Sequence, residues 1–239
     1  MKFFRDKLYE DITIPAPPKD DIGEAAEVKR LIANRTAEQE KSIADHDEVP
    51  FYAIKKYCDD NKMMFHKDEF KDIIYGATDT INYFKDKFDR KRPIEVDKTL
   101  DTSPSKTNKT PSYPSGHAAQ SRIVARYVAG KFPEHEANLI EAGNECGYGR
   151  VLAGFHYPSD YEAGNLLGEK MYKLMNKENY IKEMKTFKTF MESIIDIPRS
   201  TYAPGVFDGA DSKNPKIKSS VMAMIDKQVK EFEKEYPVI

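Results

Sequence analysis

Hydrophobic positions recur along most of this chain with the spacing of amphipathic helices. Between residues 68 and 90, apolar side chains return every three or four positions, at Phe70, Ile73, Ile74, Ala77, Ile81 and Phe84, which is the period of one helical face. The same spacing predicts further helices over residues 20–48, 51–60, 118–131, 134–147, 159–176, up to about 195, and 216–236. No stretch alternates with the period of two that strands show. We therefore expect an all-α, single-domain helical bundle over residues 1–239.

Two segments lack this helical pattern. Residues 1–19 end in Ile14-Pro15-Ala16-Pro17-Pro18, and because proline fixes φ and removes a backbone donor, they are predicted to form an extended N-terminal arm. Residues 94–113 are rich in Ser, Thr, Lys, Asp and Pro. Loops of this length in compact domains are usually functional or mobile, so we expect a long active-site loop there.

Charge and hydropathy exclude several classes of protein. The 239 residues carry 38 basic and 40 acidic side chains, a net charge of -2, which gives no global reason to bind nucleic acid or an anionic membrane. The most apolar windows are far shorter than the about 20 residues that a membrane span needs. Residues 1–10 are charged and show no signal peptide. The sequence therefore predicts a soluble, cytoplasmic protein. Its two cysteines, Cys58 and Cys146, leave a disulfide and two free thiols both open, with free thiols favoured.

The first block of candidate chemistry is Lys85-x6-Arg92-Pro93. Lys85 and Arg92 lie two helical turns apart, so a helix projects both from one face, and Pro93 ends or bends that helix. A guanidinium fork and an ammonium point charge together can clamp a phosphate dianion. Taken alone, the block reads more simply as a solvated basic face.

The second block, Pro114-Ser115-Gly116-His117, precedes the helix predicted from residue 118. Ser115 suits the N-cap, and Gly116 lets the backbone approach a ligand closely. Free N–H groups at a helix N-terminus bind anions such as phosphate, and His117 in the first turn can reach the same anion. Taken alone, the block is an ordinary capped helix with a surface histidine.

The third block runs from Arg150 to His156 and Asp160. Pro158 suits the first turn of a new helix, which places Asp160 just inside it and His156 just before it. A carboxylate there can accept the hydrogen of one imidazole nitrogen and leave the other as a nucleophile. Arg150 adds a third cation. Taken alone, the block is a loop histidine with a capping aspartate.

Together the three blocks specify ten residues, and their chance occurrence in this order is roughly 10⁻⁷. The combination resembles the signature of the type 2 phosphatidic acid phosphatase (PAP2) superfamily, which includes class A non-specific acid phosphatases, lipid phosphatases, glucose-6-phosphatase and vanadium haloperoxidases. Residues 112–117, the proline-rich arm and Asn34-Arg35-Thr36 are most similar to the soluble class A enzymes. The resemblance covers about residues 14–173 and implies the all-α PAP2 fold.

The resemblance implies a role for each residue of the blocks. It implies that His156 attacks phosphorus, that Asp160 orients His156, and that His117 protonates the leaving alcohol and then activates water. The phosphate ligands that it implies are Lys85, Arg92, Ser115, Gly116, His117 and Arg150. It further implies hydrolysis of small-molecule phosphate monoesters with broad specificity and an acidic optimum, no metal or other cofactor, and inhibition by vanadate.

The chain departs from the family pattern twice. Gly149 stands where the family usually has Ser before the arginine of the third block, and the signal peptide expected of periplasmic class A enzymes is missing. Two other functions share the site residues: a vanadate-dependent haloperoxidase, and a non-catalytic helical protein that binds a phospholigand. The natural substrate is undetermined, and a homo-oligomer is compatible with the sequence. Outside the blocks, Asp45-His46-Asp47-Glu48 is expected to be an exposed, charged helix end rather than a metal site, and His66 and His135 are expected at the surface.

Overall fold

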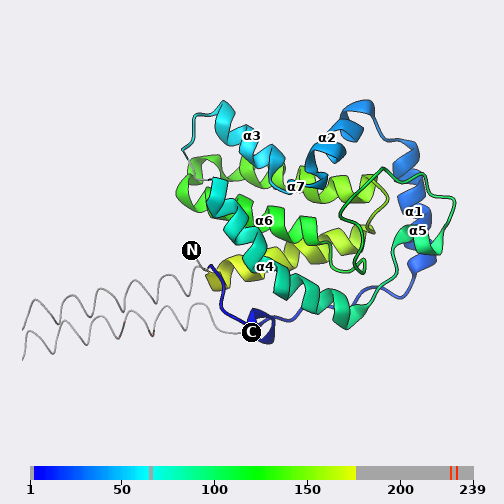
Figure 1. Ribbon diagram of the computed structural model, residues 1–239, viewed down its shortest axis with the longest axis horizontal. Helices are drawn as coiled ribbons and strands as arrows, with labels where there is room; N and C mark the ends of the chain where they lie inside the picture. The colour runs from blue at the N-terminus through cyan, green and yellow to red at the C-terminus, as the bar shows by residue number, and fades with distance from the viewer. Residues whose placement is uncertain (1–2, 65–66, 176–226, 228–229, 231–239) are drawn as a thin grey trace, which may run out of the picture. The chain divides into compact units, whose positions relative to one another are not determined.

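The protein is helical throughout the part that the computed structural model describes, residues 3–64, 67–175, 227 and 230. Its named elements, drawn in Figure 1, are η1 (Leu8–Asp11), α1 (Asp21–Ala33), α2 (Ala37–Asp47), α3 (Tyr52–Asp60), α4 (Lys67–Phe88), α5 (Pro93–Val96), α6 (Gly116–Lys131), η2 (Pro133–His135) and α7 (Glu136–Leu152). Residues 158–175 form a further helix. The predicted all-α class is confirmed, and these residues contain no strand.

The chain divides into two compact units, Met1–Tyr172 together with Ile239, and Lys173–Val238. The described residues lie almost wholly in the first unit. The helices predicted up to residue 195 and over residues 216–236 therefore lie outside the description, except for Lys227 and Lys230, which are helical. The single-domain organisation stays a prediction.

The single helix expected over residues 20–48 is two helices, α1 and α2. Thr36 forms a capping box at the start of α2, in which its side chain accepts a hydrogen bond from the Gln39 backbone N–H at 3.2 Å. The Gln39 side chain accepts one in return from the Thr36 N–H at 2.9 Å. Because this arrangement satisfies donors that a helix N-terminus leaves free, it stabilises a new helix start there. The break separates two apolar stripes that the periodicity alone had joined.

The two segments predicted to be irregular are so over most of their length. The arm contains the short 3-10 helix η1 before its extended proline-rich part. The loop over residues 94–113 begins with α5, a single turn of helix at Pro93–Val96 that Arg92 and Glu95 cap. Two helix ends differ from the predicted ones. Helix α6 begins at Gly116 rather than at residue 118, and α7 continues to Leu152 rather than ending at residue 147, which makes Arg150 a helical residue.

The core forms where α6 packs along α7, with α4 against α6, and α2 and α3 against α7 (Figure 1). The helix over residues 158–175 comes very close to the first turn of α6. A Cβ atom on Gly164 would lie only 2.5 Å from the Ser115 backbone oxygen, so a residue with a side chain there would force the two helices apart. The Ser115 N–H also donates to the Asp160 backbone oxygen at 2.9 Å. This contact joins the second and third sequence blocks.

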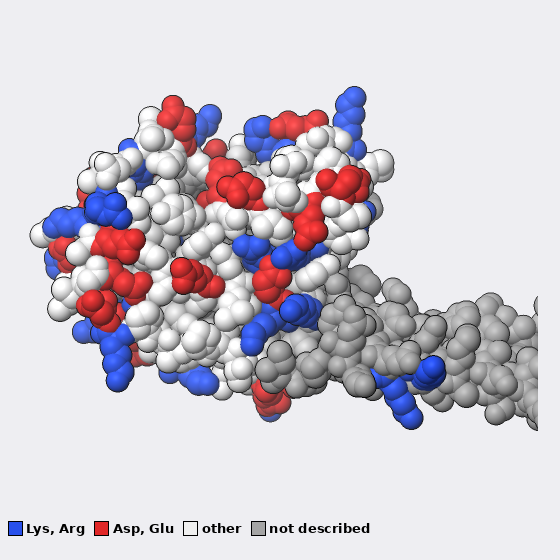
Figure 2. All heavy atoms as spheres, turned by 180° about the vertical axis from the view of Figure 1, so that it is seen from behind, with Lys and Arg blue, Asp and Glu red and all other residues white. Residues whose placement is uncertain are grey.

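Other expectations concern thiols, charge and membranes. Cys58 and Cys146 are both free and buried, and burial raises the pKa of Cys146 to about 12. Basic and acidic side chains alternate across the face shown in Figure 2, with no large patch of either sign. Among the described residues, no helix combines the length and apolar character needed to cross a bilayer.

Candidate active site

The three sequence blocks meet at one place in the fold. The last turns of α4 and α7 bring Lys85 and Arg150, and the N-cap of α5 brings Arg92. The first turn of α6 brings Ser115, Gly116 and His117, while His156 and Asp160 flank the start of the helix over residues 158–175. Burial lowers the pKa of His156 far below its usual value, and the positive charges of Arg92, Lys85 and Arg150 lower it further. Arg92 and Asp160 contact His156 directly, and Ser115 bonds to the backbone of Asp160.

His156 lies between Asp160 and Arg92. Its Nδ1 lies 3.1 Å from Oδ2 of Asp160, and its Nε2 lies 3.5 Å from Nη1 of Arg92. The carboxylate accepts the hydrogen of Nδ1, so Nε2 carries the lone pair, which faces the long contact with Nη1 of Arg92. With its pKa so strongly lowered, His156 is neutral, as a nucleophilic imidazole must be.

Asp160 is itself held in a fixed position. Its side chain is completely buried and accepts hydrogen bonds from Nη1 of Arg90 at 2.7 Å, from the Tyr157 N–H at 3.0 Å, and from the Ser112 hydroxyl. A buried carboxylate is stable only when charge and hydrogen-bond partners compensate it. These three contacts supply that compensation and leave Oδ2 directed at His156.

Arg90 is a site residue that the sequence reasoning missed. Besides Asp160, its guanidinium donates to Glu24 and, at 2.9 Å, to Asp21 of α1. Burial opposes its charge, but Asp160, Glu24 and Asp21 raise its pKa above the ordinary value. In the sequence, Arg90 stands in a run of charges that resembles a solvated face. No local pattern shows that its partners come from α1 and from the third block.

The two cations of the first block are buried among backbone carbonyls. Lys85 donates to the Pro111 oxygen, and Arg92 donates to the Thr110 and Phe155 oxygens, both at 2.8 Å. Burial, and then the charge of Arg92, lowers the pKa of Lys85 to about 7. Burial, and then Arg150, lowers the pKa of Arg92 to about 10. Cations that repel each other in a buried site create a place where an anion is favoured.

Arg150, the third cation, has partners that were not expected. Its Nη1 donates to Oδ1 of Asp47 at 2.8 Å, and its Nη2 donates to the Thr107 hydroxyl at 2.9 Å. Its Nε is buried and has no partner. Asp47 and His46 are 8% and 2% exposed, so the prediction that residues 45–48 form an exposed helix end is wrong for these two. The end of α2 packs onto α7, which the charged sequence does not reveal.

The first turn of α6 combines a capped N-terminus with His117. The Ser115 side chain caps it by accepting from the Ala118 N–H at 3.4 Å. A Cβ atom on Gly116 would lie 3.7 Å from the Lys85 side chain, so this turn faces Lys85. His117 Nε2 lies 2.9 Å from the Asp47 backbone oxygen and therefore carries a hydrogen, which leaves Nδ1 for another partner. Burial, and then Arg150, lowers the pKa of His117 to about 3.

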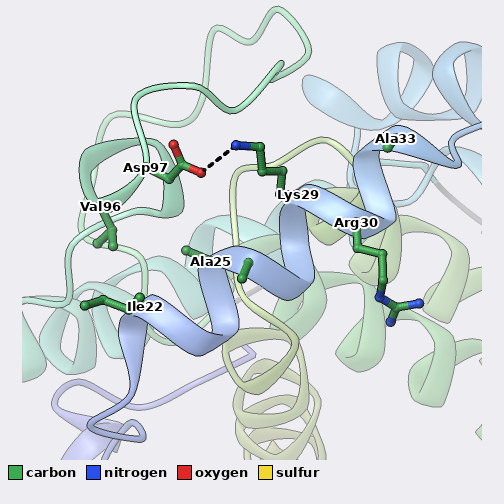
Figure 3. A pocket seen from close by; sticks show the side chains of 8 residues that line it. Ile22, Ala25, Lys29, Arg30, Ala33, Val96 and Asp97 are labelled. Carbon is green, nitrogen blue, oxygen red and sulfur yellow. Dashed lines mark hydrogen bonds and ion pairs between the residues drawn. The ribbon is translucent and has the colours of Figure 1, made fainter.

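Other features of the described part lie away from these residues. It contains no group of three or more His, Cys, Asp or Glu side chains that could hold a metal ion. A cavity of about 680 Å³ lies along α1 beside α5, where Lys29 pairs with Asp97 at 3.3 Å (Figure 3). Another of about 930 Å³ is lined by residues of α2, α3 and α7. Neither cavity is lined by a predicted phosphate ligand. His135 is partly exposed and bonded to Tyr57, and His66 lies outside the described residues.

Comparisons with known proteins cover the region that forms this site. Residues 73–177 match the model of the PAP2 superfamily. An acid phosphatase of Zymomonas mobilis is 35% identical over 92 residues, which are 37% of this chain and 35% of that protein. A non-specific acid phosphatase of Salmonella typhi is 42% identical over 57 residues, 24% and 23% of the two chains. One of Providencia stuartii is 36% identical over 62 residues, 26% and 25% of the two chains.

These alignments span about a third or less of the relatives' own lengths. The superfamily match nevertheless contains every residue that the sequence blocks single out, from Lys85 to Asp160. In the folded chain, Arg92 of the first block and Asp160 of the third block both contact His156. Residues 73–177 are therefore similar to the PAP2 superfamily over the part of the chain that carries these residues.

Proposed function

We propose that this protein is a phosphoric monoester hydrolase that transfers the phosphoryl group of a small-molecule ester first to His156 and then to water. The observation that carries the proposal is the geometry of His156, whose Nδ1 contacts Asp160 and whose Nε2 lies beside Arg92. The acid phosphatases among its relatives support the same reaction class.

In the first step, the Nε2 lone pair of His156 forms a bond to phosphorus as the bond from phosphorus to the leaving oxygen breaks. Phosphoryl transfer depends mainly on positioning and on neutralising charge on the phosphate oxygens. Lys85, Arg92 and the unpartnered Nε of Arg150 are the donors for those oxygens. Removal of one such donor typically costs about 2.7–4 kcal/mol of transition-state stabilisation.

His117 supplies the proton for the leaving oxygen. Because its Nε2 donates to the Asp47 oxygen, Nδ1 is the nitrogen that carries the transferred proton. The environment keeps His117 neutral down to about pH 3, so a charged His117 requires the negative charge of the bound ester beside it. In the second step His117 takes a proton from water, the oxygen of that water bonds to phosphorus, and the bond to His156 breaks.

Hydrolysis of this kind needs no metal ion, since the protein's own cations neutralise the phosphate. We propose a broad specificity for esters. We also propose an acidic optimum, because a low pH favours the protonated forms of His117, whose pKa is lowered to about 3, and of Lys85, whose pKa is lowered to about 7. Vanadate, which has the geometry of the phosphoryl transition state, is expected to inhibit.

Turnover of p-nitrophenyl phosphate by His156→Ala tests the proposal. This substrate has a good leaving group, so turnover should fall at least about a thousandfold, and rapid-quench labelling with ³²P substrate should yield no phosphoenzyme. His135→Ala is the matched control, because His135 contacts Tyr57 away from the site. Labelling of His156→Ala, or acid-labile phosphate on His117, would reverse the roles of the two histidines. Halide oxidation supported by vanadate would instead favour the haloperoxidase alternative.

A further inference from the structure

The carboxylate of Asp47, at the end of α2, lies on the guanidinium that is proposed to hold the substrate's phosphate. Its Oδ1 accepts from Nη1 of Arg150 at 2.8 Å across 103 residues of sequence. An arginine bound to a carboxylate makes the same charge-assisted contacts that it makes with phosphate oxygens. Asp47 therefore occupies Nη1 of the guanidinium whose free Nε is the proposed phosphate donor, and its negative charge opposes a second anion on that group.

Asp47 also anchors the loop that covers the site. Its Oδ2 accepts from the Lys106 N–H at 2.8 Å, and its Oδ1 accepts from the hydroxyls of Ser105 and, at 3.0 Å, Thr107. Thr107 additionally accepts from Nη2 of Arg150. One carboxylate thus connects three consecutive loop residues to α7.

The side chains at the centre of the site are almost completely shielded from solvent. Arg150 is 1% exposed and His156 is 2% exposed. The Thr110 and Pro111 oxygens of the same loop accept from Arg92 and Lys85. Movement of this loop would open the way to His156, and the contacts of residues 105–107 with Asp47 resist that movement.

The charge state of Asp47 strengthens the competition. Burial acts to raise its pKa, but hydrogen bonds from Ser105, Lys106 and Arg150 outweigh burial and lower the pKa well below the usual range. Asp47 is thus an anion at every pH at which the site would bind phosphate. A second anion must either displace it from Arg150 or bind against its repulsion.

We propose that Asp47 competes with the substrate's phosphate for Arg150, and that its release, together with residues 105–107, admits the ester to His156. Asp47 is then an affinity-determining residue of the site, and it makes the protein bind phosphate more weakly than its three cations alone would. This inference rests on the proposed function, because it takes Arg150 as a phosphate ligand.

Calorimetric titration of the full chain with inorganic phosphate tests the inference. Asp47→Asn keeps the shape of the side chain but removes its charge. If its NH2 group takes the place of Oδ2, it cannot accept the hydrogen bond from the Lys106 N–H. We expect its Kd for phosphate to fall about tenfold, the equivalent of about 1.4 kcal/mol. Glu48→Gln is the matched control: it removes the same charge from the neighbouring residue, which pairs with the exposed Lys106 side chain. Because an exposed ion pair contributes little, the Kd of this variant should change by less than about twofold.

Two further measurements keep the test decisive if Asp47→Asn fails to fold. Thr107→Val alters an exposed residue and removes one contact each with Asp47 and Arg150, so it should lower the Kd severalfold. In the unsubstituted chain, saturating phosphate should accelerate hydrogen exchange of the Lys106 amide, a change that a merely structural Asp47 would not produce.

The outcomes separate this inference from the proposed function. If the unsubstituted chain binds phosphate and Arg150→Ala weakens that binding, the proposed site stands. An unchanged or higher Kd for Asp47→Asn, or for Thr107→Val where the first variant does not fold, would then overturn the role of Asp47 alone. If the unsubstituted chain binds no phosphate, both proposals fail.

Discussion

Raising the pH through the pKa of Lys85 should weaken phosphate binding in a way that can be calculated. Burial, and then the charges of Arg92 and Arg150, lower this pKa from 10.5 to about 7, against the opposing effects of Asp160 and Asp86. Above pH 7, Lys85 is therefore mostly neutral until an anion binds beside it and restores its proton. Phosphate binding between pH 8 and 9 should take up about one proton, and the affinity should fall about tenfold over that unit.

Calorimetry in two buffers that differ in protonation enthalpy measures this uptake directly. The control is Lys85→Arg, whose guanidinium stays charged and which should bind phosphate without taking up a proton at pH 8. If the unsubstituted chain takes up no proton, or shows the same pH slope as Lys85→Arg, the assignment of Lys85 is refuted.

The same pKa shift predicts how stability depends on pH. Between about pH 7 and 10.5 the unfolded chain binds a proton on Lys85 that the folded chain lacks. The contribution of Lys85 to the free energy of unfolding therefore rises with pH across this window, and Lys85→Met should remove that rise in urea denaturation.

Three other outcomes follow from the site. Arg90→Met should lower the free energy of unfolding by about 3–5 kcal/mol, because it leaves Asp160 as an uncompensated buried charge; a loss below about 1 kcal/mol in urea denaturation would contradict this. Gly149→Ser should keep kcat/KM within about twofold and raise stability by up to about 0.5 kcal/mol, since a Cβ there meets only Ile43 at 3.7 Å. Hydrolysis should be indifferent to EDTA; loss of activity with recovery on adding Mg²⁺ or Zn²⁺ would disprove a metal-free site.

Local sequence signals predicted most of the described helices. The 3.6-residue period located α3, α4 and α6 to within about two residues, because an amphipathic helix must place its apolar residues on one face. The same period predicted one helix where the structure has α1 and α2, because a hydrophobic pattern carries no information about capping boxes. The pair Thr36 and Gln39 has the spacing of a capping box and could have marked the start of α2. The predicted roles of the site residues stay predictions, although the structure brings those residues together.

The sequence by itself determined the helical class and the candidate phosphate-site residues, since both rest on short-range spacing: the period along a helix, a capped N-terminus, and a histidine four residues before an aspartate. Only the tertiary structure decided what surrounds those residues. Arg90 meets Asp160 across 70 residues and Asp47 meets Arg150 across 103. Such pairs form because buried charges need compensation wherever packing places them, and packing brings together helices that no local pattern connects.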